Sequence, residues 1–238
     1  MKVPVTYKHL GRIEYQKAWD YQEQLLAENL DIKKRNRDRE LAQSSETPQI
    51  THNHLLFCEH DPVFTLGKSG HIENLLVNNQ YLADQGISFF KTNRGGDITF
   101  HGPGQIVGYP ILDLERFKPD IVWYMRNLEE IIIRTLAHWG ISAERSEGET
   151  GVWLDTDKPH LARKICAMGV RTSRWITMHG FALNVNTDLK YFNMIVPCGI
   201  QHKQVTSMEK ELGGKVSFDE VVQKIKYYFE EVFNTTPV

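Results

Sequence analysis

Helical spacing of apolar positions recurs in three stretches of the chain. The central stretch, residues 120–139, is the clearest and is followed by Gly140, a typical helix stop. The last stretch begins at Ser217, which has the capping-box spacing to Glu220. The first covers residues 15–30. The pattern therefore predicts helices near both ends of the chain and one in its middle.

Short apolar runs separated by turn signals fill the rest of the chain and predict strands. Gly108 and Pro110 interrupt one of these runs and suggest an edge strand or a break there. Strands between helices indicate an α/β protein of the α+β kind, a mixed sheet with flanking helices. The runs are residues 55–58, 63–66, 87–92, 105–114, 152–154, 164–171 and 175–185.

Residues 33–49 are charged and end near Pro48. We expect an exposed helix end followed by a charged, mobile loop. The alternative is a basic docking strip for an acidic partner, but acidic residues interleave with the basic ones. Because no linker or internal repeat divides the chain, we expect one domain over residues 1–238, with its core in residues 50–236.

Composition and charge narrow the function classes. The chain has 238 residues, 41% of them hydrophobic, which suits a globular domain. With 28 basic and 30 acidic residues the formal charge is −2, so a broad electrostatic grip on nucleic acid is not expected. Neither a secretory signal nor a membrane span is apparent. Three cysteines, an odd number, favour reduced thiols in a cytoplasmic protein over a disulfide framework.

Residues 94–105, RGGDITFHGPGQ, form the first candidate site. Four glycines allow backbone conformations and close approach that side chains would block. Arg94 and His101 add polar groups, so the segment could wrap a ligand as a loop and donate backbone N–H groups to it. The spacing fits neither a dinucleotide fingerprint nor a Walker loop. The alternative is a tight glycine turn between strands.

A second candidate is Cys198, which lies between Pro197 and Gly199 on a turn that would leave its sulfur accessible. The alternative is a small buried hydrophobic residue, the commonest role of a free cysteine.

A third candidate is Lys164, which lies in an apolar run that reads as a strand. Strand alternation would then place Lys164, Cys166 and Met168 on one face. A lysine there can act as a base or as the cation that stabilises a thiolate, although it can also extend to solvent. His179 and Gly180 break another apolar run, where the histidine either lines a pocket or is a hydrogen-bonded core residue.

A metal site is not predicted. The chain has no CxxC and no HExxH motif, and its histidines are scattered. The candidate ligands considered are His52, His54, Glu59, His60 and Asp61.

In their order and spacing, four segments resemble the lipoyl(octanoyl) transferase family. The resemblance covers roughly residues 50–210. It implies a single catalytic domain with the fold shared by biotin-protein ligases and lipoate ligases. The matching segments are RGGDITFHGPGQIVGYPILDL (94–114), KICAMGVR (164–171), WITMHGFALNV (175–185) and IVPCGI (195–200).

The resemblance also implies roles for individual residues. Cys198 would be the nucleophile that carries the acyl group, and Lys164 would lower its pKa and act as acid and base. Cys166, two residues from Lys164, remains the alternative thiol partner. His179 is a possible pocket residue. The substrate-binding residues implied are Arg94, Gly95, Gly96, Asp97, Ile98, Thr99, Phe100, His101, Ala167, Met168, Gly169, Gly180, Phe181 and Ala182.

The implied reaction moves an octanoyl group from octanoyl-acyl carrier protein to a lysine ε-amine on a lipoyl domain, through a cysteine thioester. The acceptors would be the E2 subunits of 2-oxoacid dehydrogenases and the glycine cleavage H protein. A thioester donor needs neither ATP nor a metal, because forming the amide is downhill. The alternatives are an ATP-dependent lipoate-protein ligase on the same fold and a non-catalytic module that binds carrier domains.

Overall fold

The computed structural model describes residues 2–196 and 204–238. Its strands are β1 (Val3–Ile13), β2 (His54–His60), β3 (Val63–Leu66), β4 (Ser88–Lys91), β5 (Ile98–His101), β6 (Gln105–Ile111), β7 (Val152–Leu154), β8 (Arg163–Ser173), β9 (Ile176–Asn184), β10 (Gln204–Val205) and β11 (Thr235–Pro237). Its α-helices are α1 (Tyr15–Leu41), α2 (Asn79–Asp84), α3 (Ile121–Ala137), α4 (Met208–Leu212) and α5 (Phe218–Phe233). The 3₁₀ turns are η1 (Ile72–Asn74), η2 (Leu114–Arg116) and η3 (Leu189–Met194).

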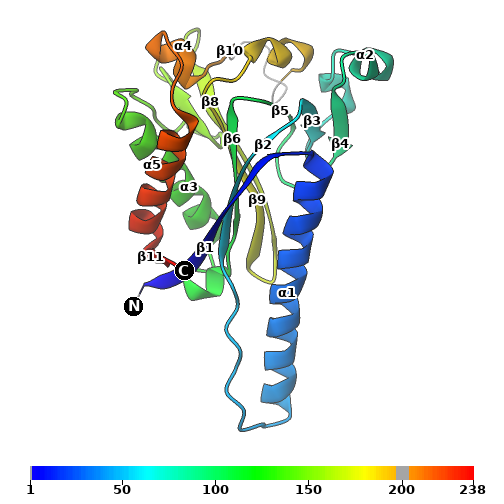
Figure 1. Ribbon diagram of the computed structural model, residues 1–238, viewed down its shortest axis with the longest axis vertical. Coiled ribbons are helices and arrows are strands. Elements are labelled where there is room, and N and C mark those ends of the chain that lie inside the picture. Colours follow the sequence, from blue (N-terminus) through cyan, green and yellow to red (C-terminus); the bar gives the residue numbers. More distant parts are fainter. Residues whose placement is uncertain (1, 197–203) are drawn as a thin grey trace.

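A large mixed sheet forms the centre of the molecule, in the strand order β10-β8-β9-β6-β2-β1-β11, with β7 paired to β8. Helix α1 covers one face, and α3 and α5 cover the other (Figure 1). Each helical layer encloses its own apolar cluster against the sheet. These layers confirm the predicted mixed sheet with flanking helices.

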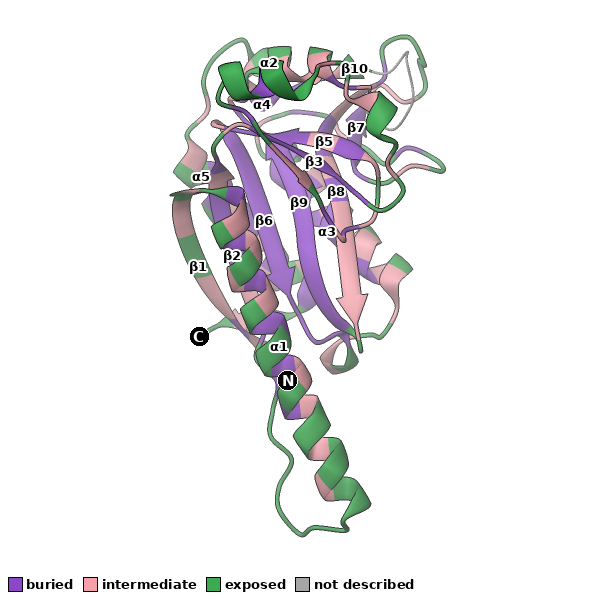
Figure 2. Ribbon diagram, turned by 90° about the vertical axis from the view of Figure 1, so that its right-hand side faces the viewer, coloured by how far each residue is buried: buried purple, intermediate pink, exposed green. Residues whose placement is uncertain are grey.

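A second sheet, in the order β4-β3-β5, lies near the upper ends of β8 and β9 (Figure 2). Its strands pack on α2 and η3 through a third apolar cluster built around Phe64 and Phe100. This sheet supplies one wall of the pocket described below.

Local signals explain why the predicted helices form. The Asp120 carboxylate accepts the N–H of Trp123 and begins α3, and the Ser217 hydroxyl accepts the N–H of Glu220 and begins α5. Gly140 follows α3 in the left-handed conformation, with φ of 74°. The predicted helices and strands are therefore confirmed: the runs 63–66 and 152–154 coincide with β3 and β7, and the other elements differ from prediction at their ends.

Two expectations near the N-terminus need correction. The chain begins with strand β1, which the helical pattern did not reveal. Helix α1 also continues through the first nine residues of the charged segment 33–49 and ends at Leu41, so the loop is shorter than expected. Its distal turns are exposed beyond the end of the sheet (Figure 2), whereas Lys33 bonds Asp113 and Glu115 at the sheet's lower end.

The expected edge position of β6 is wrong, because β6 lies between β2 and β9 in the interior of the sheet. The ladder between β6 and β9 ends where Gly108 faces Phe181. Pro110 lies beyond that point, where β6 and β9 are no longer paired. Its lack of a backbone N–H therefore removes no ladder hydrogen bond to β9. Gly108 is needed for a different reason, since a Cβ there would lie 2.1 Å from the Phe181 ring.

No helix in the described part of the chain is both long enough and apolar enough to cross a membrane.

Candidate active site

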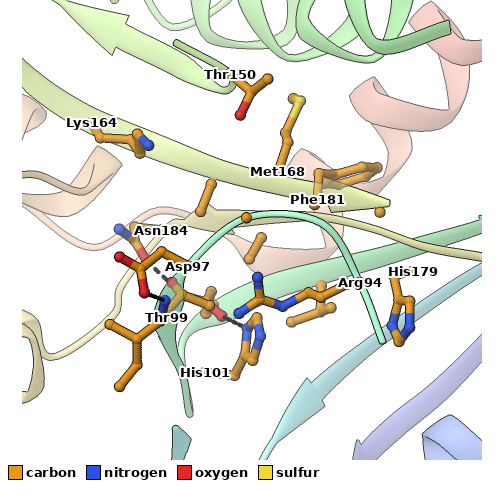
Figure 3. Close-up of a pocket in the computed structure, with 18 of the residues that line it drawn as sticks. Arg94, Asp97, Thr99, His101, Thr150, Lys164, Met168, His179, Phe181 and Asn184 are labelled. Carbon is orange, nitrogen blue, oxygen red and sulfur yellow. Dashed lines mark hydrogen bonds between the residues drawn. The ribbon is translucent and has the colours of Figure 1, made fainter. Parts of the chain in front are cut away.

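A pocket opens between β8 and β9 of the large sheet and β5 of the small one (Figure 3). It holds about 840 Å³ of empty space, counting its open mouth. Part of its lining is apolar and includes Ile98, Ala167, Met168, Phe181 and Phe192. Buried polar groups occupy the end near His179, and Lys164 lies at the other end.

Glycines let the polypeptide backbone form part of this pocket. The Gly95 N–H donates to the Val170 carbonyl at 2.9 Å, so the turn after Arg94 crosses β8. A Cβ on Gly169 would lie 2.6 Å from the Gly95 carbonyl oxygen and 3.3 Å from the Arg94 side chain. Position 169 must therefore be glycine for the turn to lie this close to the strand.

The glycine-rich segment is not one continuous loop, which corrects the expectation for residues 94–105. Residues 98–101 form strand β5, paired with β3. The turn before it is anchored by Arg94, whose Nη2 donates to the carbonyl oxygen of Thr65 at 2.7 Å and to its hydroxyl at 2.9 Å. The Arg94 guanidinium is thus a fixed buried cation in the pocket wall.

His101 is held by two neighbours in one protonation state. Its Nδ1 lies 2.8 Å from the Gln105 Oε1, an acceptor, so this nitrogen carries the proton. Its Nε2 lies 3.4 Å from the Thr65 hydroxyl. Burial lowers the pKa of His101 to about 3, with the charges of His60 and Arg94 acting in the same direction. His101 is therefore neutral near pH 7.

A hydrogen-bond chain continues from His101 to the Lys164 end of the pocket. The Gln105 amide donates to Asn184 Oδ1 at 2.9 Å, and the Asn184 amide donates to the Thr206 carbonyl at 3.0 Å. The Thr206 N–H in turn donates to the Lys164 carbonyl at 3.0 Å. The Thr206 hydroxyl donates to the Glu211 carboxylate at 2.5 Å. The backbone of Lys164 is thus tied to the same network as His101.

His179 reaches the pocket through an unusual backbone conformation. Its φ is 60°, a left-handed value that is rare for a side chain other than glycine or asparagine. Met178 packs in the cluster under α1, and His179 also contacts α1 through Trp19. Two consecutive strand residues therefore point to the same face, which regular alternation would forbid. The conformation re-aims the imidazole toward the pocket.

The His179 ring is neutral, and one of its nitrogens has no partner among the described residues. Nε2 lies 2.7 Å from Asn93 Oδ1, which accepts its proton, because the Asn93 amide nitrogen donates to Glu23. Nδ1 is buried and makes no hydrogen bond to any residue in the described part of the chain. Burial lowers the pKa of His179 to about 3, and the charge of Arg94 adds to this shift. Nδ1 is thus a bare acceptor in the wall of the pocket.

Three of the five candidate metal ligands have other side-chain partners in the fold. His60 Nδ1 lies 2.8 Å from the Ile13 carbonyl and Nε2 lies 2.7 Å from the Tyr109 hydroxyl. Burial lowers the pKa of His60 to about 4. Glu59 accepts the Gly104 N–H, and Asp61 pairs with Arg12.

Lys164 and Cys166 do not share a face, so that expectation is wrong. In the pairing of β7 with β8, Val152 faces Cys166 but Trp153 faces Lys164, so two residues of β7 span three of β8. This bulge breaks the alternation of side chains. Lys164 lines the pocket, whereas Cys166 is fully buried in the core under α3 and α5.

The two described cysteines are poor nucleophiles. Burial raises the pKa of the Cys166 thiol and of the Cys58 thiol, and neither side chain has exposed area. The alternative pairing of Cys166 with Lys164 is therefore disfavoured. Cys198 lies outside the described residues.

The pocket brings together most of the residues named from the sequence. Gly95 and Phe100 lie outside the lining: Gly95 bonds to β8, and Phe100 stacks on Tyr191 with ring centroids 4.4 Å apart. The residues that do line the pocket are Arg94, Gly96, Asp97, Ile98, Thr99, His101, Lys164, Ala167, Met168, Gly169, His179, Gly180, Phe181 and Ala182.

Several pocket residues were missed from the sequence. Gln105 and Asn184 stand in the motifs that carry the resemblance, and their signal was a polar residue within an apolar strand. Tyr15, which lines the pocket, was assigned only to helix packing. Trp153, which lies outside the lining but contacts Lys164, was assigned only to a strand. For these two residues no local pattern indicated their spatial neighbours.

Solved structures of lipoate and biotin protein ligases share this fold. A bipartite lipoate protein ligase from Thermoplasma acidophilum matches with a TM-score of 0.67 at 17% identity, covering 99% of this chain and 88% of that one. A biotin protein ligase from Aquifex aeolicus matches with a TM-score of 0.51 at 11% identity, covering 97% and 70%. The predicted fold class is confirmed.

The chain belongs to the family of the lipoyl protein ligase A/B catalytic domain, whose model matches residues 14–230. An octanoyltransferase from Flavobacterium johnsoniae is 56% identical over 234 residues, 98% of each chain. Another, from Christiangramia forsetii, is 55% identical over 234 residues, 98% of this chain and 97% of the relative. The family expected from the four motifs is confirmed.

Proposed function

We propose that this protein transfers octanoyl groups to lysine side chains of lipoyl domains, as the first step of endogenous protein lipoylation. The observation that carries the proposal is the identity above 50% to octanoyltransferases over nearly the whole chain. The pocket supports it, because an apolar lining between Ile98 and Phe181 suits a hydrocarbon chain. Each buried CH₂ contributes about 0.8 kcal/mol.

The acyl donor in this proposal is octanoyl-acyl carrier protein, and the nucleophile is Cys198. Its thiolate attacks the donor's thioester carbonyl and forms a new C–S bond. The bond to the phosphopantetheine sulfur breaks, and that sulfur takes a proton from the Lys164 ammonium. One thioester replaces another, so this half of the reaction is close to balanced. The cysteine needs activation, because a free thiol with a pKa near 8.5 is mostly protonated at pH 7.

The second half forms the amide. The ε-amine of the acceptor lysine attacks the acyl-enzyme carbonyl, a C–N bond forms and the C–S bond to Cys198 breaks. The neutral Lys164 takes the proton that the amine loses, which restores the ammonium and thiolate pair. Lys164 is suited to this role because its side chain lines the pocket at the end away from His179.

The acceptors we propose are lipoyl domains of 2-oxoacid dehydrogenase E2 subunits and the glycine cleavage H protein. Because the donor is already a thioester, the reaction requires neither ATP nor a metal. We place the reaction in the cytoplasm, where the cysteines stay reduced.

Intact-mass measurement after incubation with octanoyl-acyl carrier protein tests the reaction class. We expect the enzyme to gain one octanoyl group, and peptide mapping to place that group on Cys198. Cys198→Ala should abolish the gain, and the matched variant Cys166→Ala should retain it. If the octanoyl group is found on the Cys166 peptide and Cys198→Ala is still active, the assignment of Cys198 as the nucleophile is wrong.

The same assay separates transfer from ligation. A lipoate-protein ligase would need free acid, ATP and Mg²⁺, and would form no acyl-enzyme. We expect transfer to a lipoyl domain to proceed with EDTA present and nucleotide absent. A strict requirement for ATP would overturn the proposed donor.

A further inference from the structure

Lys164 lies against the indole of Trp153. Its Nζ is 4.5 Å from the centroid of the Trp153 ring, and the two residues face each other across β7 and β8. Trp153 is 3% exposed, and Lys164 is half-buried. The lysine's charged head therefore meets an aromatic face that is shielded from water.

The backbone around Trp153 directs its ring toward the lysine. Its N–H donates to the Glu144 carbonyl at 2.9 Å, and its carbonyl accepts the Glu144 N–H at 2.8 Å. Both backbone groups of Trp153 thus point away from β8. Its pair with Lys164 is then the non-hydrogen-bonded kind, in which opposing side chains lie closer together.

Gly151 lies on the other side of the lysine stem, and it must be glycine because a Cβ there would lie 2.5 Å from the Cys166 carbonyl oxygen. It has a φ of 103°, and a Cβ built on it would lie 3.6 Å from the Lys164 Cε. Its N–H donates to the buried Glu129 carboxylate at 3.1 Å, which fixes the glycine to α3. The stem of Lys164 thus runs between a glycine and an indole, both held by neighbouring elements.

An aromatic face attracts a cation through its quadrupole, and tryptophan does so most strongly. Unlike a carboxylate, the ring carries no net charge. It therefore holds an ammonium without neutralising the positive charge that the ammonium presents to a nearby anion. A neutral amine loses most of this attraction. The contact is therefore strongest in the state in which the lysine must stabilise an anion, and weakest when it must accept a proton.

We propose that Trp153 is a positioning residue for the reaction, whose ring face holds the ammonium of Lys164 at the end of the pocket away from His179. This inference rests on the proposed function, in which Lys164 supplies a cation and then a base. Trp153 acts through Lys164 and touches no reacting atom.

Substitutions at Trp153 give the first test. We expect Trp153→Leu to lower kcat for octanoyl transfer about tenfold, with little change in KM for octanoyl-acyl carrier protein. Trp153→Phe retains a weaker ring face and should fall between wild type and Trp153→Leu. Thermal melts show whether each variant is folded.

Fluorinated tryptophans give the sharper test, because each fluorine withdraws electrons from the ring face and hardly changes its size. With one to four fluorines placed site-specifically at position 153, we expect log kcat to fall in proportion to the ring's loss of cation affinity. The matched control is the same series at Trp175, which is 37% exposed at the β8–β9 hairpin. It should leave kcat unchanged.

If kcat does not change with the number of fluorines at position 153, the proposal is overturned even if Trp153→Leu is inactive. The ring would then act only by filling space. Lys164→Met separates this failure from failure of the proposed function. If Lys164→Met is inactive and the fluorine series is flat, Lys164 keeps its role and only the inference about Trp153 falls. If Lys164→Met transfers octanoyl at the wild-type rate, the role of the lysine itself is wrong.

Discussion

The two ends of the pocket differ in how their polar groups are held. At the His179 end, the imidazoles of His101 and His179 are buried and neutral, and the Arg94 guanidinium is bonded to the Thr65 backbone. At the other end, Lys164 is half-buried and rests on an indole face. The polar groups at the His179 end are held by hydrogen bonds, whereas the ammonium of Lys164 contacts a ring that carries no net charge. In the proposed reaction, the His179 end sets the shape of the pocket and the Lys164 end supplies the chemistry.

Lys164→Met should give the largest effect. It removes the charge and the base but keeps most of the stem volume. We expect octanoyl transfer to fall by about 10²-fold or more, the usual contribution of a general acid–base group. Iodoacetamide alkylation of Cys198, followed against pH, should shift its midpoint upward toward about 8.5.

Lys164→Arg is the matched control, because it retains a cation that cannot release its proton. It should preserve part of the alkylation reactivity and lose amide formation. Identical alkylation profiles for wild type and Lys164→Met would contradict electrostatic coupling between the two side chains.

Gly169→Ala tests the shape of the other end. Its Cβ would lie 2.6 Å from the Gly95 carbonyl oxygen, so the turn that carries Arg94 must move. We expect a loss of about 1–3 kcal/mol in the free energy of unfolding, together with a severalfold rise in KM. Gly214→Ala is the matched control, since a Cβ there meets nothing within 4 Å. Equal melts and kinetics for both variants would show that the turn is not tightly packed.

Acid should destabilise the histidine-rich end. His101 and His179 titrate near pH 3 in the folded protein and His60 near pH 4, against 6.5 for an unperturbed histidine. Between these values the unfolded chain binds protons that the folded chain does not, so the free energy of unfolding falls as pH falls. Each histidine contributes at most about 1.4 kcal/mol per pH unit.

Urea melts across that window measure the slope, and His179→Asn should make it shallower, because asparagine tolerates the left-handed conformation without titrating. An unchanged slope in this variant would mean that His179 is already protonated or solvated at neutral pH.

Thr206→Val tests whether the two ends are linked. Valine keeps the volume of this buried side chain but cannot donate to Glu211, which also pairs with Arg163. Loss of one bond to a charged group should cost about 1.5–3 kcal/mol of stability. The backbone N–H that donates to the Lys164 carbonyl survives the substitution, but the hydroxyl no longer anchors Thr206; we expect the backbone to shift and kcat to fall severalfold. Thr206→Ser retains the donor and should recover both; equal losses in the two variants would exclude the hydroxyl as the cause.

Cys166→Ala should give the smallest effect. Removing one buried sulfur costs about 1 kcal/mol in the free energy of unfolding, and turnover should stay near wild type because this thiol faces the core. If this variant melts normally but its turnover is below a tenth of wild type, Cys166 takes part in the reaction.

The helices were predictable because their signals are local. Asp120 and Ser217 cap α3 and α5 from within one turn, and the apolar positions that follow repeat along one face. Strand β1 was missed because its pattern is interrupted by Lys8 and Arg12, and because its partners, β2 and β11, are distant in sequence. Pro110 in an interior strand was misread for a similar reason, since the end of a ladder depends on the neighbouring strand.

The sequence by itself determined which residues form the candidate site. Arg94, His101, Lys164 and His179 all stand in motifs whose order identifies the family, and all four line one pocket. Local spacing is enough for this, because a motif records which side chains a chemistry requires.

Only the tertiary structure decided how those side chains are aimed. A bulge opposite β7 turns Cys166 into the core and leaves Lys164 in the pocket. The left-handed backbone of His179 aims its own imidazole toward the pocket, on the side of α1. The contact between Lys164 and Trp153 depends on that same pairing of strands. Strand alternation can be read from a few neighbouring residues, but the irregularities that override it are set by backbone partners on other strands, which no local pattern contains.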